Sequence, residues 1–185
     1  RLHQETYDVM SKTREQFGVH YEVGFPNASQ VKMLLAKKGP NSFYENIENR
    51  KECCHIRKVE PLNQLLSTAD AWITGLRRDQ SMIRSSLDEV AWDDAHHMVK
   101  INPLASWSLE QVWDYIKEHS IPYNELHDQG FPSIGCAPCT RAVKEGEDIR
   151  AGRWWWENSD QKECGLHVVD GKLVRKAGKI NGPFG

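Results

Sequence analysis

The cysteines are the residues of this chain whose spacing most directly suggests chemistry. Cys53 and Cys54 are adjacent in KECCHIRK, and Cys136 and Cys139 form the C-x-x-C pair of GCAPC. A C-x-x-C pair suits a redox dithiol, half of a zinc site or half of an iron–sulfur site. Adjacent cysteine side chains diverge, so they reach separate irons of a cluster more easily than one zinc ion. The two pairs favour a shared [4Fe–4S] site, with zinc as the main rival and plain burial as small hydrophobic side chains as the third interpretation.

The fifth cysteine, Cys164, lies apart from the others in KECGLH. Lys162 and His167 are close to it in sequence, and nearby cations favour the thiolate form of a cysteine. The glycine that follows leaves the sulfur accessible. We therefore expect Cys164 to be a nucleophile, and an exposed thiol without a role is the simpler alternative.

Three pairs of basic residues accompany these motifs. They are Arg57 and Lys58, Arg77 and Arg78, and Arg150 and Arg153. Arginine and lysine bind phosphate and sulfate through charge-assisted hydrogen bonds, so the pairs together predict a clamp for a compact polyanion. The net charge of −2 and the lack of a long basic stripe argue against nucleic acid as the partner. At least one of the three consecutive tryptophans after Arg153 is expected to belong to the core.

The elements that must position these residues alternate between helices and strands. Helices are predicted over 2–17, from Asn27 or Ser29 to Gly39, over 61–66 and over 108–120, and strands over 21–25, 71–75 and 98–105. The helix SLEQVWDYIKEHS is the clearest, because Ser108 and Gln111 form a capping box before an apolar face. This alternation predicts an α/β layer with a parallel sheet.

Composition sets the broad class. The chain has 185 residues, enough for one domain with a sizeable core, and it is 39% hydrophobic and 27% charged. No apolar run approaches the roughly 20 residues that span a bilayer, and no signal-peptide pattern is present. In such a chain, spaced cysteines indicate metal binding or catalysis before disulfides. We therefore expect a cytoplasmic protein with no membrane partner.

Five motifs, taken in order, closely resemble the assimilatory adenosine 5′-phosphosulfate (APS) reductases. They are KECCHIRK, WITGLRRDQS, SIGCAPCTRAV, GRWWWE and KECGLH. The resemblance covers nearly the whole chain. It implies a single α/β domain over 1–185 of the adenine-nucleotide alpha-hydrolase-like (Rossmann-like) type, with a mostly parallel central sheet and with 165–185 as a tail or lid.

The resemblance also implies a cofactor and a reaction. The residues that match the [4Fe–4S] ligands are Cys53, Cys54, Cys136 and Cys139. Cys164 matches a catalytic nucleophile that attacks the sulfur of APS, so that AMP leaves and an S-sulfocysteine forms. Thioredoxin, a separate protein here, then releases sulfite, which makes the expected enzyme a thioredoxin-dependent adenylyl-sulfate reductase of assimilatory sulfate reduction. Substrate binding is implied for Arg57, Lys58, Arg77, Arg150, Arg153, His167 and Leu2.

The sequence departs from the family pattern in two places. The family's S-G-G phosphate loop lies upstream of the segment that matches Arg1, so we expect this chain to be the C-terminal portion of the domain. No counterpart of the thioredoxin-like domain of plant-type enzymes is present. The related 3′-phospho-APS (PAPS) reductases generally lack the four cluster cysteines, which favours APS as substrate. A PAPS or dual-specificity reductase and a non-catalytic iron–sulfur sensor remain alternatives, and a homo-oligomer is compatible with either.

Overall fold

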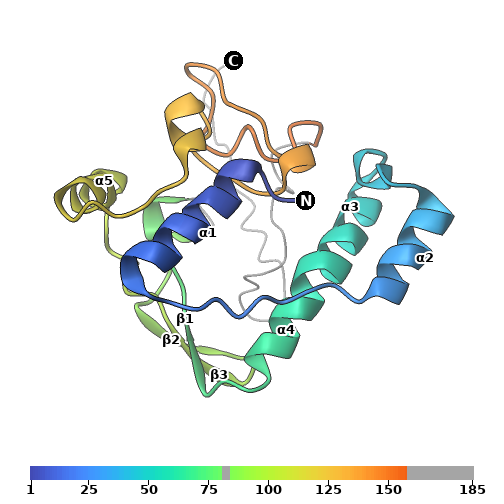
Figure 1. Cartoon of the computed structure of the whole chain (residues 1–185), viewed down its shortest axis with the longest axis horizontal. Coiled ribbons are helices and arrows are strands. Elements are labelled where there is room, and N and C mark those ends of the chain that lie inside the picture. The colour runs from blue at the N-terminus through green and yellow to red at the C-terminus, as the bar shows by residue number, and fades with distance from the viewer. Residues whose placement is uncertain (81–83, 158–185) are drawn as a thin grey trace, which may run out of the picture.

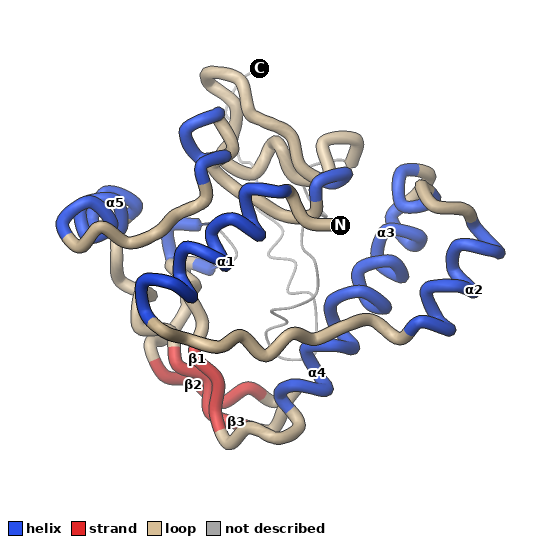
Figure 2. Tube along the Cα trace, viewed as in Figure 1, coloured by secondary structure: helices blue, strands red, loops and turns tan. Residues whose placement is uncertain are grey.

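The computed structural model describes residues 1–80 and 84–157, in which five α-helices and three strands form an α/β fold with a small sheet (Figures 1 and 2). The helices are α1 (Gln4–Phe17), α2 (Ala28–Lys38), α3 (Ile47–Cys54), α4 (Glu60–Leu66) and α5 (Leu109–Glu118), and the strands are β1 (Ala71–Ile73), β2 (Val90–Asp93) and β3 (Met98–Ile101). Over these residues, no helix is long and apolar enough to cross a bilayer.

The sheet is mixed in the part of the chain described. Its strand order is β1-β3-β2, with β1 parallel to β3 and β2 antiparallel to β3. A mostly parallel sheet was expected, and the described sheet has one parallel and one antiparallel strand pairing. The predicted strands over 71–75 and 98–105 are present in shorter form as β1 and β3.

One predicted strand is wrong, and one strand of the structure was not predicted. Residues 21–25 form no strand, and their side chains stay in solvent, with Val23 58% and Phe25 79% exposed. This segment is an extended connection from α1 to α2 because no other strand of the described chain lies beside it. The sequence analysis also missed β2, which ends in a turn where the Asp93 carboxylate accepts the backbone N–H groups of Ala95 and His96 at 3.1 and 3.3 Å.

Local capping explains where the helices begin and end. The Asn27 side chain caps α2 by accepting the N–H groups of Ser29 and Gln30 at 3.0 and 3.2 Å, so Asn27 is the cap and Ser29 is not. The predicted capping box of Ser108 and Gln111 starts α5. These side chains satisfy the first N–H groups of each helix, which have no partner inside the helix.

Helices α3 and α4 are joined end to end through a π-helical turn, His55–Val59. Figure 1 shows α2 beside α3, and Lys38 of α2 joins them by donating to Glu52 at 2.6 Å and to Asn49 at 2.8 Å. The two adjacent cysteines end α3, directly before the π turn. The helical hairpin thus fixes the position of both the cysteines and the basic residues that follow them.

Candidate functional site

The structure brings the two cysteine pairs together. Cys53 and Cys54 come from the end of α3, whereas Cys136 and Cys139 flank a short 3₁₀ turn more than eighty residues later. All four belong to one buried cluster that also contains the aromatic side chains of Phe43, Trp154 and Trp156. All four are free thiols, with Cys54 and Cys139 buried and the other two half-buried.

The electrostatics of this cluster disfavour a set of free thiolates. Burial, followed by the neighbouring thiols of Cys136 and Cys54, raises the pKa of Cys139 from 9.0 to about 12. The ammonium group of Lys58 acts in the opposite direction on the same thiol. Thiols that interact in this way oppose one another's ionisation, and a bound metal would replace their protons.

The chemistry of the donor set admits both an iron–sulfur group and a structural zinc ion. The four groups are all sulfur, which is the ligand set of [4Fe–4S] clusters and of some structural zinc sites. In the described residues, no group of three or more His, Cys, Asp or Glu side chains is arranged to hold one metal ion. The structure therefore shows that the four thiols converge in one buried cluster.

The loop that carries the C-x-x-C pair is held by its own hydrogen bonds. Thr140 donates its hydroxyl to the carbonyl of Cys136 at 3.0 Å and accepts the N–H of Gly135 at 3.1 Å. The Tyr44 hydroxyl donates to the carbonyl of Pro138 at 2.6 Å, which ties the loop to the segment before α3. These bonds fix the loop backbone from which the two thiols project.

Two predicted anion-binding residues, Arg57 and Lys58, lie on the π turn next to the cysteines. Lys58 acts electrostatically on Cys139, so its ammonium group lies near the cluster. The Nε atom of Arg57 is buried and has no hydrogen-bond partner in the described chain. A buried donor without a partner is costly, and an anionic ligand is one way to satisfy it.

Arg153 is brought to the same place from the other side. It forms an isolated antiparallel bridge with Thr140, the residue after Cys139, and its Nη1 donates to the carbonyl of Ile134 at 3.2 Å. The guanidinium lies directly on Gly135, where a Cβ atom would stand 2.4 Å from Nη2. Glycine is therefore required there for the arginine to pack.

The remaining predicted residues are placed differently. Arg77 pairs with Asp79 at 2.9 Å, and Asp79 also accepts the N–H of Leu109 at the start of α5. The backbone N–H of Arg150 donates to Asp148 at 2.8 Å in the turn before Arg153. Nothing in the described chain connects Arg77 to the cysteines.

The N-terminal segment reaches the cysteine loop, although Leu2 itself is 42% exposed. The carbonyl of Arg1, its neighbour, accepts the N–H of Ala137 at 2.8 Å. Cys164 and His167 lie outside the described residues, so their roles stay predictions.

Sequence reasoning missed a buried ion pair beside the cysteines. Arg50 donates from Nε to Oε1 of Glu157 at 2.9 Å and from Nη2 to Oε2 at 2.8 Å, and the two side chains are 1% and 3% exposed. Trp154 is 1% exposed, which confirms that one of the three tryptophans is core. The one available signal for Arg50 is its position four residues before Cys54, which puts both on one face of α3.

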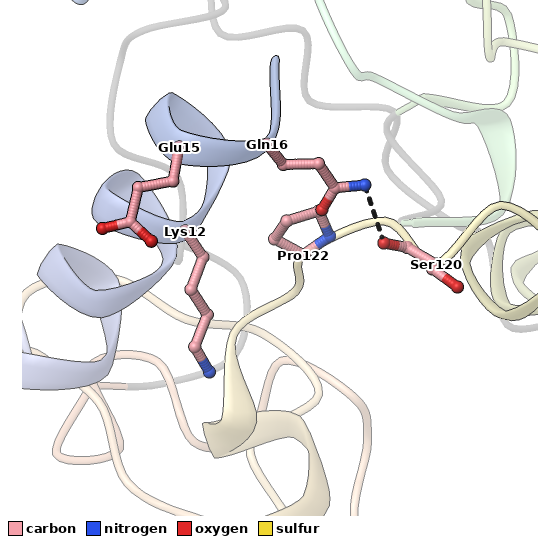
Figure 3. Close-up of a pocket in the computed structure, with 5 residues that line it drawn as sticks. All are labelled: Lys12, Glu15, Gln16, Ser120 and Pro122. Carbon is pink, nitrogen blue, oxygen red and sulfur yellow. Dashed lines mark hydrogen bonds between the residues drawn. The ribbon is translucent and has the colours of Figure 1, made fainter. Parts of the chain in front are cut away.

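An open hollow of about 500 Å³ lies away from this site, between α1 and the segment after α5. Its lining is Lys12, Glu15, Gln16, Ser120 and Pro122, and Figure 3 shows Gln16 donating to the Ser120 carbonyl across it. None of the residues predicted for chemistry lines it. The volume of this hollow therefore does not by itself identify the residues that carry out chemistry.

The fold and the site define an α/β domain in which two cysteine pairs gather in one buried cluster, with basic side chains beside it. The chain belongs to the phosphoadenosine phosphosulfate reductase domain family, whose model matches residues 1–142. The resemblance to the APS reductases is thereby confirmed.

Individual relatives agree with this assignment. The chain is 52% identical over 169 residues to an adenosine 5′-phosphosulfate reductase of Burkholderia cepacia, covering 91% of this chain and 68% of that protein. It is 48% identical over 167 residues to an adenosine 5′-phosphosulfate reductase of Allochromatium vinosum, covering 90% of this chain and 65% of that protein. The crystal structure of a PAPS reductase from Candida auris in a phosphate complex matches with a TM-score of 0.62 and 28% identity over 77% of this chain and 66% of that one. The chain thus spans about two thirds of the length of these relatives.

Proposed function

We propose that this chain is part of an enzyme that reduces APS to sulfite and AMP in sulfate assimilation. The observation that carries the proposal is the convergence of two cysteine pairs in one buried cluster, with Lys58 and Arg153 beside it. Relatives that are 48–52% identical are named adenosine 5′-phosphosulfate reductase. The free thiols of the described chain suit a reducing compartment, in line with the predicted cytoplasmic location.

The four cysteines are proposed to hold a [4Fe–4S] cluster. Cys53, Cys54, Cys136 and Cys139 offer four sulfur ligands in two pairs, and a bound cationic group would offset the burial and the neighbouring thiols that raise the pKa of Cys139. When bound, the group would add charge beside the residues proposed to bind the substrate. Zinc without sulfide in anaerobically prepared protein would contradict this assignment.

The basic residues are proposed to bind the phosphosulfate. Arg57 brings a buried donor without a partner in the described chain, and Lys58 brings a cation beside the cysteines. Arg150 and Arg153 approach through the segment that pairs with Thr140. Arg77, His167 and Leu2 complete the proposed contacts. These cations offset the repulsion between a thiolate and an anionic sulfate and stabilise charge on the leaving AMP.

The proposed reaction passes through sulfur. The Cys164 thiolate attacks the sulfate sulfur of APS, the bond from that sulfur to the AMP phosphate oxygen breaks, and an S-sulfocysteine forms. A thioredoxin thiolate then attacks the Cys164 sulfur, sulfite leaves with the electron pair of the S–S bond, and the mixed disulfide is resolved by the second thioredoxin thiol. Thioredoxin therefore supplies both electrons.

PAPS is the competing substrate, because the family model and the Candida auris structure carry PAPS reductase in their names. The experiment is a mass spectrum of the full-length protein after anaerobic incubation with APS, and separately with PAPS, without reductant. We expect a sulfite-sized mass gain on the Cys164 peptide with APS, released by thioredoxin. A gain with PAPS alone would change the substrate, and no gain with either on cluster-loaded protein would favour a sensor.

A further inference from the structure

One buried cation contacts the cysteines without belonging to the predicted anion clamp. Arg50 lies one helical turn before Cys54 on α3, and its guanidinium hydrogen-bonds the Cys54 sulfur. Arginine has only donors, so the N–H groups point at the thiol and the sulfur accepts. The side chain is 1% exposed, so solvent does not screen this contact.

The rest of the guanidinium is held in a fixed orientation. Glu157 accepts two parallel hydrogen bonds at 2.9 and 2.8 Å, the fork geometry that orients an arginine most strictly. One face of the guanidinium covers the Trp154 ring, with 4.4 Å from Cζ to the ring centroid. The backbone N–H of Trp154 in turn donates to the carbonyl of Cys139 at 3.1 Å. Arg50 is thus connected to Cys54 on its own helix and, through Trp154, to the loop that carries Cys139.

We propose that Arg50 is a positioning residue for the cysteine site, one that donates a charge-assisted N–H···S hydrogen bond to Cys54 while Glu157 and Trp154 fix its orientation. The inference rests on the proposed function, because it takes Cys54 as an iron ligand. Hydrogen bonds to the ligand sulfurs tune iron–sulfur clusters and orient their ligands. In the described chain the Glu157 carboxylate balances the buried charge by bonding to Arg50 and not to a cysteine, so the two members of the ion pair have different roles toward the metal.

The test compares Arg50→Gln with Glu157→Gln in full-length protein loaded anaerobically with iron and sulfide. Both variants break the same ion pair, so both lower the urea midpoint of the metal-free protein. Only Arg50→Gln removes the charged donor to Cys54 and leaves a shorter, neutral amide in its place. The readout is the resonance Raman spectrum of the iron–cysteine stretching bands, together with the rate of iron loss to a chelator.

A hydrogen bond draws electron density from the sulfur and weakens its bond to iron. We therefore expect Arg50→Gln to shift a terminal Fe–S band to higher frequency and to release iron about 10-fold faster, on the scale of other residues that orient metal ligands. Glu157→Gln keeps the Arg50 donor to Cys54, so the Fe–S band should stay at its original frequency or move to a lower one. Arg50→Lys, which restores a cationic donor, returns the band toward its original position, and Arg50→Met, which has no N–H donor, replaces Arg50→Gln if that variant fails to fold.

An unchanged band in Arg50→Gln, or the same upward shift in both variants, would overturn the role of Arg50 and leave the proposed cluster standing. Wild-type protein that takes up no iron and sulfide would overturn both proposals together.

Discussion

A methyl group added at Gly152 is predicted to separate the two segments that hold the cysteine loop. A Cβ atom there would stand 2.2 Å from the carbonyl oxygen of Arg141 and 3.3 Å from Cγ1 of Val143. The first of these contacts is with backbone, so no rotamer change relieves it. Gly152 also accepts the N–H of Arg141 at 3.0 Å, next to the bridge between Thr140 and Arg153.

The magnitude follows from the cost of forcing extra atoms into a packed interior. Overpacking by a methyl group costs about 1–3 kcal/mol. For a domain of 150–250 residues, each kcal/mol lowers Tm by about 2–4 °C. We therefore expect Gly152→Ala to melt about 2–12 °C below wild type. The backbone that carries Cys139 and Arg153 must shift with it, so the variant should also retain less iron.

The assay is thermal unfolding of the metal-free, reduced protein, followed by iron analysis after anaerobic loading. Gly75→Ala is the matched control, because a Cβ atom at Gly75 meets no atom within 4 Å and the residue is not in the left-handed region. It should be neutral or gain up to about 1 kcal/mol by restricting the unfolded chain. If Gly152→Ala has the same Tm as Gly75→Ala and retains the same amount of iron, the close approach of the two segments is refuted.

Three further predictions concern different parts of the molecule. Because burial and neighbouring thiols raise the pKa of Cys139 from 9.0 to about 12, the metal-free protein should lose stability as pH rises from 9 toward 12. Urea midpoints across that range measure the loss, and Cys139→Ser should make the midpoint depend less on pH. An equal pH dependence in the variant would contradict the raised pKa of Cys139 as its cause. Arg57→Ala should lower kcat/KM for APS about 100-fold, on the scale of one lost oxyanion donor. It should not lower Tm, because the Nε atom that it removes is a buried donor without a partner in the described chain. A lower Tm with unchanged kcat/KM would make Arg57 structural. Ser108→Ala removes the cap of α5 and should cost about 1 kcal/mol in urea unfolding, with APS turnover unchanged; altered turnover would connect α5 to the site.

Local signals made much of this fold predictable from the sequence. The helices α2 and α5 begin at polar caps that are visible in the sequence, because a cap needs only residues within one turn. The short strands were harder, since a strand is stabilised by its partner and a partner is distant in sequence. Residues 21–25 have the apolar alternation of a strand and lack that partner in the described chain.

Some residues of the candidate site could be predicted from the sequence and others could not. The cysteine pairs were predictable as a set because few other arrangements use two pairs of thiols. Arg50 and Glu157 were not, because their bond joins residues 107 positions apart and each reads alone as a charge on a solvated surface. Burial turned this ordinary pair into part of the site, and burial is a property of the folded chain.

The π turn between α3 and α4 has a consequence for insertions and deletions. There the N–H of Glu60 bonds to the carbonyl of His55, five residues back, so the turn contains one residue more than an α-helical turn. Each residue of a regular helix rotates the next by about 100°. The wide turn absorbs the extra residue, so α4 keeps its direction, whereas the residues inside the turn are rotated relative to Cys54 by less than this angle per residue. The direction in which Arg57 and Lys58 point from Cys54 is therefore set by the number of residues in the turn as much as by their identity, and a chain one residue shorter here would change that direction without moving α4.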